Sequence, residues 1–120
     1  MKKLINKQSD GTFVAMQYDG INLDIFKTNK SGDTTSAIKV TLNNNDVLNL
    51  LLWIDNHLNG LNYSALKFSN GCSSIGYTEF TNLPRLELKY KNGGIDGCVG
   101  ILLCNRDLQD ISQLIKTGMT

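Results

Sequence analysis

The sequence predicts an α+β fold in which a unit of four antiparallel strands and one helix occurs twice, as a tandem duplication (ββββα-ββββα). In each half of the chain, short segments of alternating apolar and polar residues precede one segment with apolar residues at helical spacing. The two helical segments also begin alike, because LNNNDVLNLLLWI at residues 42–54 matches LCNRDLQDISQLI at residues 103–115 in pattern. These observations predict one domain made of two pseudo-symmetric repeats, about residues 1–60 and 61–120.

Length and composition support a single globular domain. A chain of 120 residues can bury roughly 65 to 70 per cent of its unfolded surface. Its content of 41% hydrophobic and 19% charged residues predicts an ordinary folded protein that is ordered except at its ends. The N-terminal MKKLINKQSDGTF lacks the apolar run of a secretory signal, and the longest apolar window, VLNLLLWI, is too short to cross a bilayer. We therefore expect a cytoplasmic protein that does not associate with membranes.

Strands of the first repeat are expected at residues 2–8, 12–18, 21–28 and 36–43. Asp-Gly pairs at residues 10–11 and 19–20 predict hairpin turns between the first three strands. The polar segment NKSGDTT predicts a loop before the fourth strand. Alternation places Ile21, Leu23 and Ile25 on the inner side of the third strand.

The helix of the first repeat is expected to span Asn44–Leu58. Asn43 or Asn44 can cap its first turn, where Asp46 adds a negative charge that the helix dipole favours. Its inward stripe is formed by Val47, Leu50, Leu51, Ile54 and Leu58, and is widened by Leu48, Leu52 and Trp53. Asn59 and Gly60 end the helix.

The second repeat follows the same order, with strands at residues 64–71, 73–80, 85–91 and 97–104 and a helix from about Asn105 to Lys116. Corresponding pairs include Leu23 and Leu86, Ile25 and Leu88, and Asp46 and Asp107. Coincidence is the alternative, because strands and helices use few residue types. The recurrence of two hairpin turns, one strand pair and one helix start in the same order favours duplication.

The sequence offers no set of residues for catalysis or metal binding. Neither a disulfide framework nor a zinc site fits the spacing of Cys72, Cys98 and Cys104, so free buried thiols are expected. His57 is the only histidine, the glycine-rich NGGIDGCVG lacks the Lys-Ser/Thr ending of a phosphate-binding loop, and Glu79 and Glu87 have no nucleophile nearby. We expect no catalytic residue, no metal and no cofactor, and therefore a protein that is not an enzyme.

The positive charges are concentrated on predicted strands. A net charge of +1 is low for a nucleic-acid-binding protein, but the distribution of charge matters more than its sum. The predicted helix at residues 44–58 contains Asp46 and Asp55 and neither Lys nor Arg. The strands or their ends carry Lys2, Lys3, Lys7, Lys27, Lys39, Lys67, Arg85, Lys89 and Lys91.

Two outer strand faces are candidate binding surfaces. Alternation in one strand places Arg85, Glu87, Lys89 and Lys91 opposite Leu86, Leu88 and Tyr90. Phe26 shares the outer face of another strand with Asn22 and Asp24, and an exposed ring there would stack a base, a contact worth roughly 1 to 3 kcal/mol. Further stacking candidates are Tyr18, Phe68 and Tyr77, whereas Trp53 and Tyr63 are expected in the core.

Both features also have structural interpretations. Lysines on strands prevent edge-to-edge aggregation of sheets, so these cations would serve that purpose without any ligand. Phe26 would equally suit packing against a neighbouring subunit. The sequence alone leaves these alternatives open.

The strand-to-helix junction VTLNNNDVLNLL, residues 40–51, resembles part of a known family. A strand, a leucine, a capping residue, an acidic residue and an apolar helix start follow one another, as in the coactivator family called positive cofactor four. The order of elements over nearly the whole chain is similar to that family and to the Whirly family of single-stranded nucleic-acid binders. The resemblance implies a Whirly-like fold. The lysine-rich signature of plant Whirly proteins is absent, and small phage-encoded single-strand binders are a closer expectation.

We therefore expect a sequence-tolerant single-stranded DNA-binding protein, encoded by a phage and acting in DNA replication or recombination in the host cytoplasm. It is expected to form a homo-oligomer and to cooperate with a recombinase or replication protein. The predicted nucleic-acid-binding residues are Lys3, Lys7, Phe26, Lys39, Lys67, Tyr77, Arg85, Lys89 and Lys91. The alternative is a non-enzymatic structural or regulatory module for protein–protein interaction.

Overall fold

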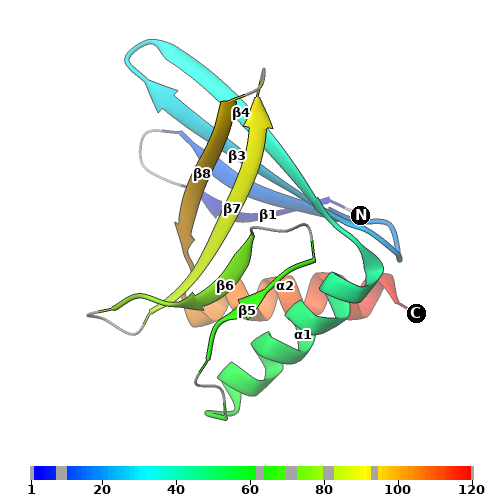
Figure 1. The fold of residues 1–120 in the computed structure, drawn as a ribbon. Coiled ribbons are helices and arrows are strands. Elements are labelled where there is room, and N and C mark those ends of the chain that lie inside the picture. Colours follow the sequence, from blue (N-terminus) through cyan, green and yellow to red (C-terminus); the bar gives the residue numbers. More distant parts are fainter. Residues whose placement is uncertain are drawn as a thin grey trace.

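The fold consists of two four-stranded antiparallel sheets, each followed in the chain by one helix (Figure 1). The computed structural model describes residues 2–7, 11–61, 64–69, 73–79, 83–92 and 95–119. Sheet A contains β1 (Lys2–Lys7), β2 (Phe13–Tyr18), β3 (Leu23–Ser31) and β4 (Thr34–Leu42), followed by α1 (Asn44–Leu58). Sheet B contains β5 (Leu66–Lys67), β6 (Ser74–Tyr77), β7 (Pro84–Asn92) and β8 (Ile95–Leu102), followed by α2 (Asn105–Gly118).

Both sheets are simple meanders, in which each strand pairs with the next strand of the chain. The predicted α+β class and the order ββββα-ββββα are therefore confirmed, and α1 has the predicted bounds. Figure 1 shows sheet B in front of sheet A, with the two helices together at one end of the molecule. This arrangement is consistent with a duplication.

The inner faces of both sheets and the two helices share one hydrophobic core. Fully buried side chains come from sheet A (Met16, Leu23, Ile25, Leu42), from sheet B (Ile75, Leu86, Leu88) and from the helices (Leu50, Ile54, Leu108, Ile111). Trp53 is buried as predicted, and its indole N–H donates to the Ser64 carbonyl at 2.9 Å, whereas Tyr63 lies outside the described residues. The faces of the sheets turned away from this core are called the outer faces.

Each helix packs against the sheet of the other repeat. The helix α2 follows sheet B in the chain but contacts β1 and β2 of sheet A. The helix α1 contacts β5 of sheet B as well as β4, the strand that leads into it, and the two helices contact each other. Because each sheet receives a helix from the other repeat, the two repeats complete the core jointly.

Two corresponding aspartates, Asp46 and Asp107, form hydrogen bonds between the helix of one repeat and the sheet of the other. Asp46, in the first turn of α1, is 3% exposed and accepts hydrogen bonds from the N–H and the hydroxyl of Ser69, in the turn after β5, at 3.0 and 2.8 Å. Asp107, in the first turn of α2, is 7% exposed and accepts a bond from the side-chain amide of Asn6 in β1 at 3.2 Å. Each carboxylate therefore connects the start of its helix to the first hairpin of the other repeat.

The β3–β4 hairpin is longer than the sequence predicts. The segment NKSGDTT, predicted as a loop, continues both strands, and Ser31 pairs with Thr34 across a two-residue turn. Gly32 permits this turn because its φ is +61°, a conformation that glycine adopts at little cost. The opposite difference occurs in sheet B, where β5 has two residues although a strand over residues 64–71 is predicted.

Three side chains predicted to face inward are exposed. Ile21 is 61% exposed because it lies in the turn before β3. Leu48 and Leu52 are 44% and 60% exposed, so α1 buries a narrower stripe than predicted.

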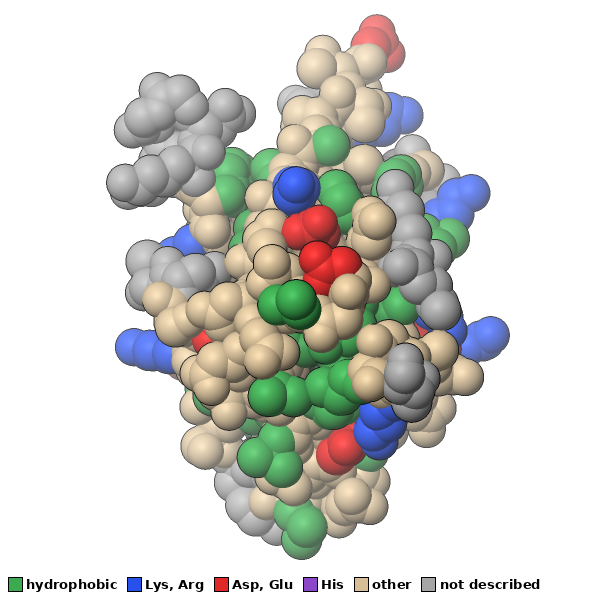
Figure 2. Space-filling view, turned by 90° about the vertical axis from the view of Figure 1, so that its right-hand side faces the viewer, with side chains coloured by type: hydrophobic (Ala, Val, Ile, Leu, Met, Phe, Trp, Pro, Cys, Tyr) green, Lys and Arg blue, Asp and Glu red, His purple; other side chains and the backbone are tan. Residues whose placement is uncertain are grey.

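Figure 2 shows a face of the molecule on which hydrophobic side chains gather in the lower half. No helix in the described part of the chain is both long and apolar enough to span a membrane.

We expect removal of the Asp46 carboxylate to destabilise the fold. Asp46→Ala leaves the N–H and hydroxyl of Ser69 without their acceptor and removes a negative charge from the start of α1. The free energy of unfolding, measured by urea denaturation at neutral pH, is expected to fall by about 1 to 3 kcal/mol.

Asp33→Ala is the matched control, because Asp33 is exposed in the β3–β4 turn and its loss is expected to change the unfolding free energy by no more than about 0.5 kcal/mol. Ser69→Ala combined with Asp46→Ala is expected to be non-additive, since both variants remove the same contact. Equal unfolding free energies for the wild type and Asp46→Ala would show that this carboxylate does not hold α1 to sheet B.

Candidate nucleic-acid interface

The outer face of sheet A contains a row of residues that runs across all four strands. Phe26 of β3 pairs with Ala15 of β2 on one side and with Lys39 of β4 on the other, and Ala15 pairs with Leu4 of β1. Ala15 is buried although it faces away from the core, because the larger side chains of its two cross-strand neighbours lie beside it. Phe26 is half-buried, and Leu4 is 53% exposed. The row therefore presents an apolar surface that ends in a cation.

A second row on the same face contains Lys7 and Phe13. Lys7 of β1 pairs with Phe13 of β2, and the Phe13 N–H donates to Thr28 Oγ1 of β3 at 2.7 Å. Lys7 is exposed and Phe13 is half-buried. The set of residues predicted from the sequence does not include Phe13. The signal that reveals it is alternation in β2, where Val14 and Met16 belong to the core.

Two lysines of the long β3–β4 hairpin lie on the same face as these rings. Lys39 is the direct cross-strand neighbour of Phe26, and Lys30, also missing from the predicted set, lies on the same face further along the hairpin. Both lysines are exposed, and neither forms an ion pair with another described residue. Asp24, a carboxylate on this face, accepts a hydrogen bond from the Thr41 hydroxyl at 2.6 Å.

The outer face of sheet B carries cations, and none of its described side chains is aromatic. Lys67 of β5 lies in the same row as Glu87 of β7, two strands away. Arg85 and Lys89 lie two residues before and after Glu87 and therefore on the same face. Lys67 and Lys89 are exposed and form no ion pair within the described part of the chain. Lys91 also belongs to β7, but its side chain lies outside the description.

Glu87 binds two neighbouring side chains on this face. Its Oε2 atom is 2.7 Å from Nη1 of Arg85, and its Oε1 atom accepts a hydrogen bond from the thiol of Cys98 in β8 at 3.2 Å. The thiol hydrogen bond and the guanidinium, acting against partial desolvation, hold the pKa of Glu87 below its ordinary value. Desolvation and the same carboxylate raise the pKa of the Cys98 thiol. At neutral pH the carboxylate is therefore ionised and compensates the charge of Arg85.

Two predicted binding residues lie on inner faces. Lys3 of β1 is turned toward α2, where its Nζ atom is 3.4 Å from Oδ1 of Asp110. Tyr77 of β6 is turned toward α1, where its hydroxyl forms a hydrogen bond with Nδ1 of His57 at 2.7 Å and its ring centre is 5.2 Å from that of Trp53. Both positions alternate with the outer-face residues of their strands. Neither side chain belongs to the surfaces described above.

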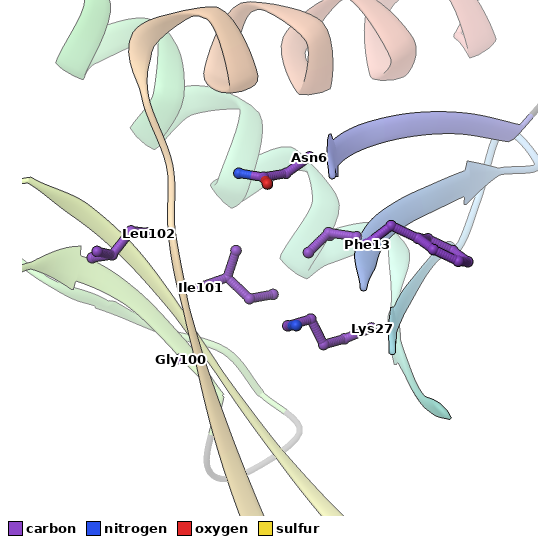
Figure 3. Close-up of a pocket in the computed structure, with 7 residues that line it drawn as sticks. Asn6, Phe13, Lys27, Gly100, Ile101 and Leu102 are labelled. Atoms are coloured by element: carbon purple, nitrogen blue, oxygen red, sulfur yellow. The ribbon is translucent and has the colours of Figure 1, made fainter. Parts of the chain in front are cut away.

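Lys27 faces a cavity of about 260 Å³ between the two sheets. The cavity is lined by Asn6, Phe13, Val14, Lys27, Gly100, Ile101 and Leu102. The Lys27 Nζ atom donates to the neighbouring Thr28 carbonyl at 2.9 Å. Figure 3 shows the ring of Phe13 pointing away from the cavity, in agreement with its place on the outer face of sheet A. Lys27 is the titratable side chain among the described lining residues, and no carboxylate, thiol or hydroxyl of that lining accompanies it.

The structure thus divides the predicted binding residues into groups. It brings together Lys7, Phe26 and Lys39 on sheet A, and Lys67, Arg85 and Lys89 on sheet B. Tyr18 and Phe68 are 2% and 3% exposed, so the expectation that their rings are available for stacking is wrong. The described cations of the outer faces thus belong to two different sheets.

The described residues form neither a metal site nor a disulfide. They contain no group of three His, Cys, Asp or Glu side chains placed to hold a metal ion. Cys98 and Cys104 are free, as expected, but they are exposed and not buried, and Cys72 lies outside the description. Comparison of the chain with protein families, with curated proteins and with solved structures finds no match.

We expect the Glu87 carboxylate to stabilise the fold at neutral pH but not in acid. Because its pKa in the folded protein lies below the ordinary value of 4.5, its contribution is fully present above that pH and is lost as the pH falls through the folded-state pKa. Glu87→Gln is therefore expected to lower the free energy of unfolding at neutral pH, with a difference from the wild type that shrinks in acid. Urea denaturation over a series of pH values measures this difference.

Glu79→Gln is the matched control, because Glu79 is exposed in the turn after β6 and its removal is expected to have little effect at any pH. A difference between the wild type and Glu87→Gln that grows as the pH falls would contradict the assigned role of this carboxylate.

Proposed function

We propose that this protein binds single-stranded DNA with little sequence preference and is not an enzyme. The observation that carries the proposal is the outer face of sheet A, where Lys7, Phe13, Phe26 and Lys39 come from β1, β2, β3 and β4 in that order. Two aromatic rings thus lie between two lysines. Rings on a sheet surface stack bases of every kind, because each base has a π-face, and the adjacent lysines attract phosphates in a salt-dependent manner.

The distribution of charge supports the same proposal. Lysine and arginine side chains on the described outer faces outnumber the carboxylates, which are Asp24 and Glu87. Two carboxylates of the helices, Asp46 and Asp107, are buried and hydrogen-bonded. A polyanion is therefore attracted to the outer faces of the sheets, although the net charge of the chain is only +1.

We further infer a Whirly-like arrangement, a phage origin, and a role in DNA replication or recombination in the host cytoplasm. The order ββββα-ββββα and the strand-to-helix junction at residues 40–51 support these inferences. A recombinase or replication protein is the partner that such a role implies. The exposed Leu48 and Leu52 of α1 support self-association, because a second copy would cover them.

A titration of fluorescent oligo-dT with the protein, followed by anisotropy, tests the proposal. We expect saturable binding at low salt that weakens as salt is added, since each neutralised phosphate contributes about −0.7 to the slope of log K against log salt. The two lysines beside the rings of sheet A would alone give a slope of about −1.4. An absence of binding at low salt would refute the proposal and favour the protein–protein interaction module, for which the exposed leucines of α1 are candidate contacts.

Variants of sheet A locate the site. Phe13→Ala and Phe26→Ala are each expected to weaken binding of oligo-dT by about 1 to 3 kcal/mol, because each removes one stacking ring. Lys39→Gln is expected to reduce the magnitude of the salt slope by about 0.7. Leu61→Ala and Lys116→Gln, at exposed positions away from the outer faces, are the matched controls and should bind as the wild type does. Equal affinities of the wild type and the double phenylalanine variant would remove sheet A from the mechanism.

A further inference from the structure

Arg85 has a specific support on the outer face of sheet B. It lies between Gly76 of β6 and Leu102 of β8, and its side chain is 41% exposed. Its guanidinium lies across Gly100 of β8, because a Cβ atom added at that position would be 2.1 to 2.5 Å from the Nη2, Cζ and Nε atoms. Any side chain at position 100 would therefore displace the guanidinium.

Glu87 holds the same guanidinium from the side. The Nη1 atom of Arg85 is 2.7 Å from Oε2 of Glu87. The Oε1 atom of the same carboxylate accepts a hydrogen bond from the Cys98 thiol at 3.2 Å. The carboxylate is thereby fixed between β7 and β8. Because the guanidinium is already held in place, it loses less conformational freedom when a ligand binds than an unrestrained side chain would.

The ion pair with Glu87 makes Arg85 better suited to contact a base than a phosphate. Its charge is compensated by Glu87, so a phosphate gains less from Arg85 than from Lys67 or Lys89, which form no ion pair with a described residue. A base carries no net charge and requires a plane on which to stack, and the guanidinium keeps its plane within the ion pair. Leu102, the cross-strand neighbour of Arg85, is 54% exposed and adds apolar surface beside it.

We propose that Arg85 is a base-stacking residue, whose guanidinium rests on Gly100 and is held by Glu87, while Lys67 and Lys89 contact the neighbouring phosphates. This inference depends on the proposed binding of single-stranded DNA and adds to it a base contact on sheet B. Sheet A then stacks bases on phenylalanine rings, and sheet B stacks them on a planar cation.

The variant Arg85→Lys separates the two roles, because lysine keeps the charge and lacks the plane. Its dissociation constants for oligo-dT and for an abasic oligonucleotide of equal length are compared with those of the wild type at one salt concentration. We expect oligo-dT binding to weaken at least about fivefold, the lower end of what one stacked base contributes. Binding of the abasic strand is expected to stay within about twofold, since the charge is retained.

A second variant tests the support without changing Arg85 itself. Gly100→Ala places a Cβ atom where the guanidinium lies and is expected to cause the same base-specific loss. Lys89→Gln is the matched comparison on the same face and should weaken binding of both oligonucleotides alike, because it removes a phosphate contact. Circular dichroism and the urea unfolding midpoint establish that each variant is folded.

The outcomes are distinguishable. If Arg85→Lys weakens binding of both oligonucleotides equally, Arg85 is a phosphate contact and the inference is wrong. If it changes neither affinity, Arg85 takes no part in binding. In both cases the wild type still binds oligo-dT and Phe26→Ala still weakens that binding, so the proposed function survives. If the wild type itself does not bind oligo-dT, the proposed function fails and this inference fails with it.

Discussion

The attachment of each helix to the sheet of the other repeat is the constraint on which the rest of the structure depends. A unit of roughly sixty residues is only marginally able to bury its apolar surface, and a four-stranded sheet whose inner face is uncovered would bury less still. The hydrogen bonds of Asp46 with Ser69 and of Asp107 with Asn6 occur at equivalent places, where a helix begins beside the first hairpin of the other repeat. They hold each helix against the inner face that the alternating apolar residues of the strands create, so the opposite face of each sheet is left to solvent.

Local patterns in the sequence predict the elements whose determinants lie within one segment. The bounds of α1 follow from the Asn43 cap and from apolar spacing inside a single helix. The β3–β4 turn is not predictable in this way, because a polar loop and a polar hairpin have the same composition. The hairpin is recognised only in the structure, where Gly32 adopts a φ of +61° in a two-residue turn. The placement of Lys3 and Tyr77 depends on which residue of a short strand faces inward, and Lys3 meets its partner Asp110 only through the packing of α2 on sheet A.

In the candidate site, too, local sequence patterns predict some features and not others. Alternation is enough to place Phe26, Lys39 and Lys89 on outer faces, because each strand carries its own pattern. The contact of Arg85 with Gly100 is different, because it depends on the register between β7 and β8, which no single segment encodes. The sequence shows that position 100 is a glycine, but it does not show that the Arg85 guanidinium lies across this glycine.

The separation of the two outer faces bears on how a long strand would be bound. Because the core occupies the inner face of each sheet, the described cations outside the core belong to the outer faces of two different sheets. A four-stranded sheet offers a short site, so we expect a long single strand to be bound by several copies. The exposed Leu48 and Leu52 belong to α1 and not to either outer face. Self-association through these leucines would therefore join copies while leaving both sheets free to bind.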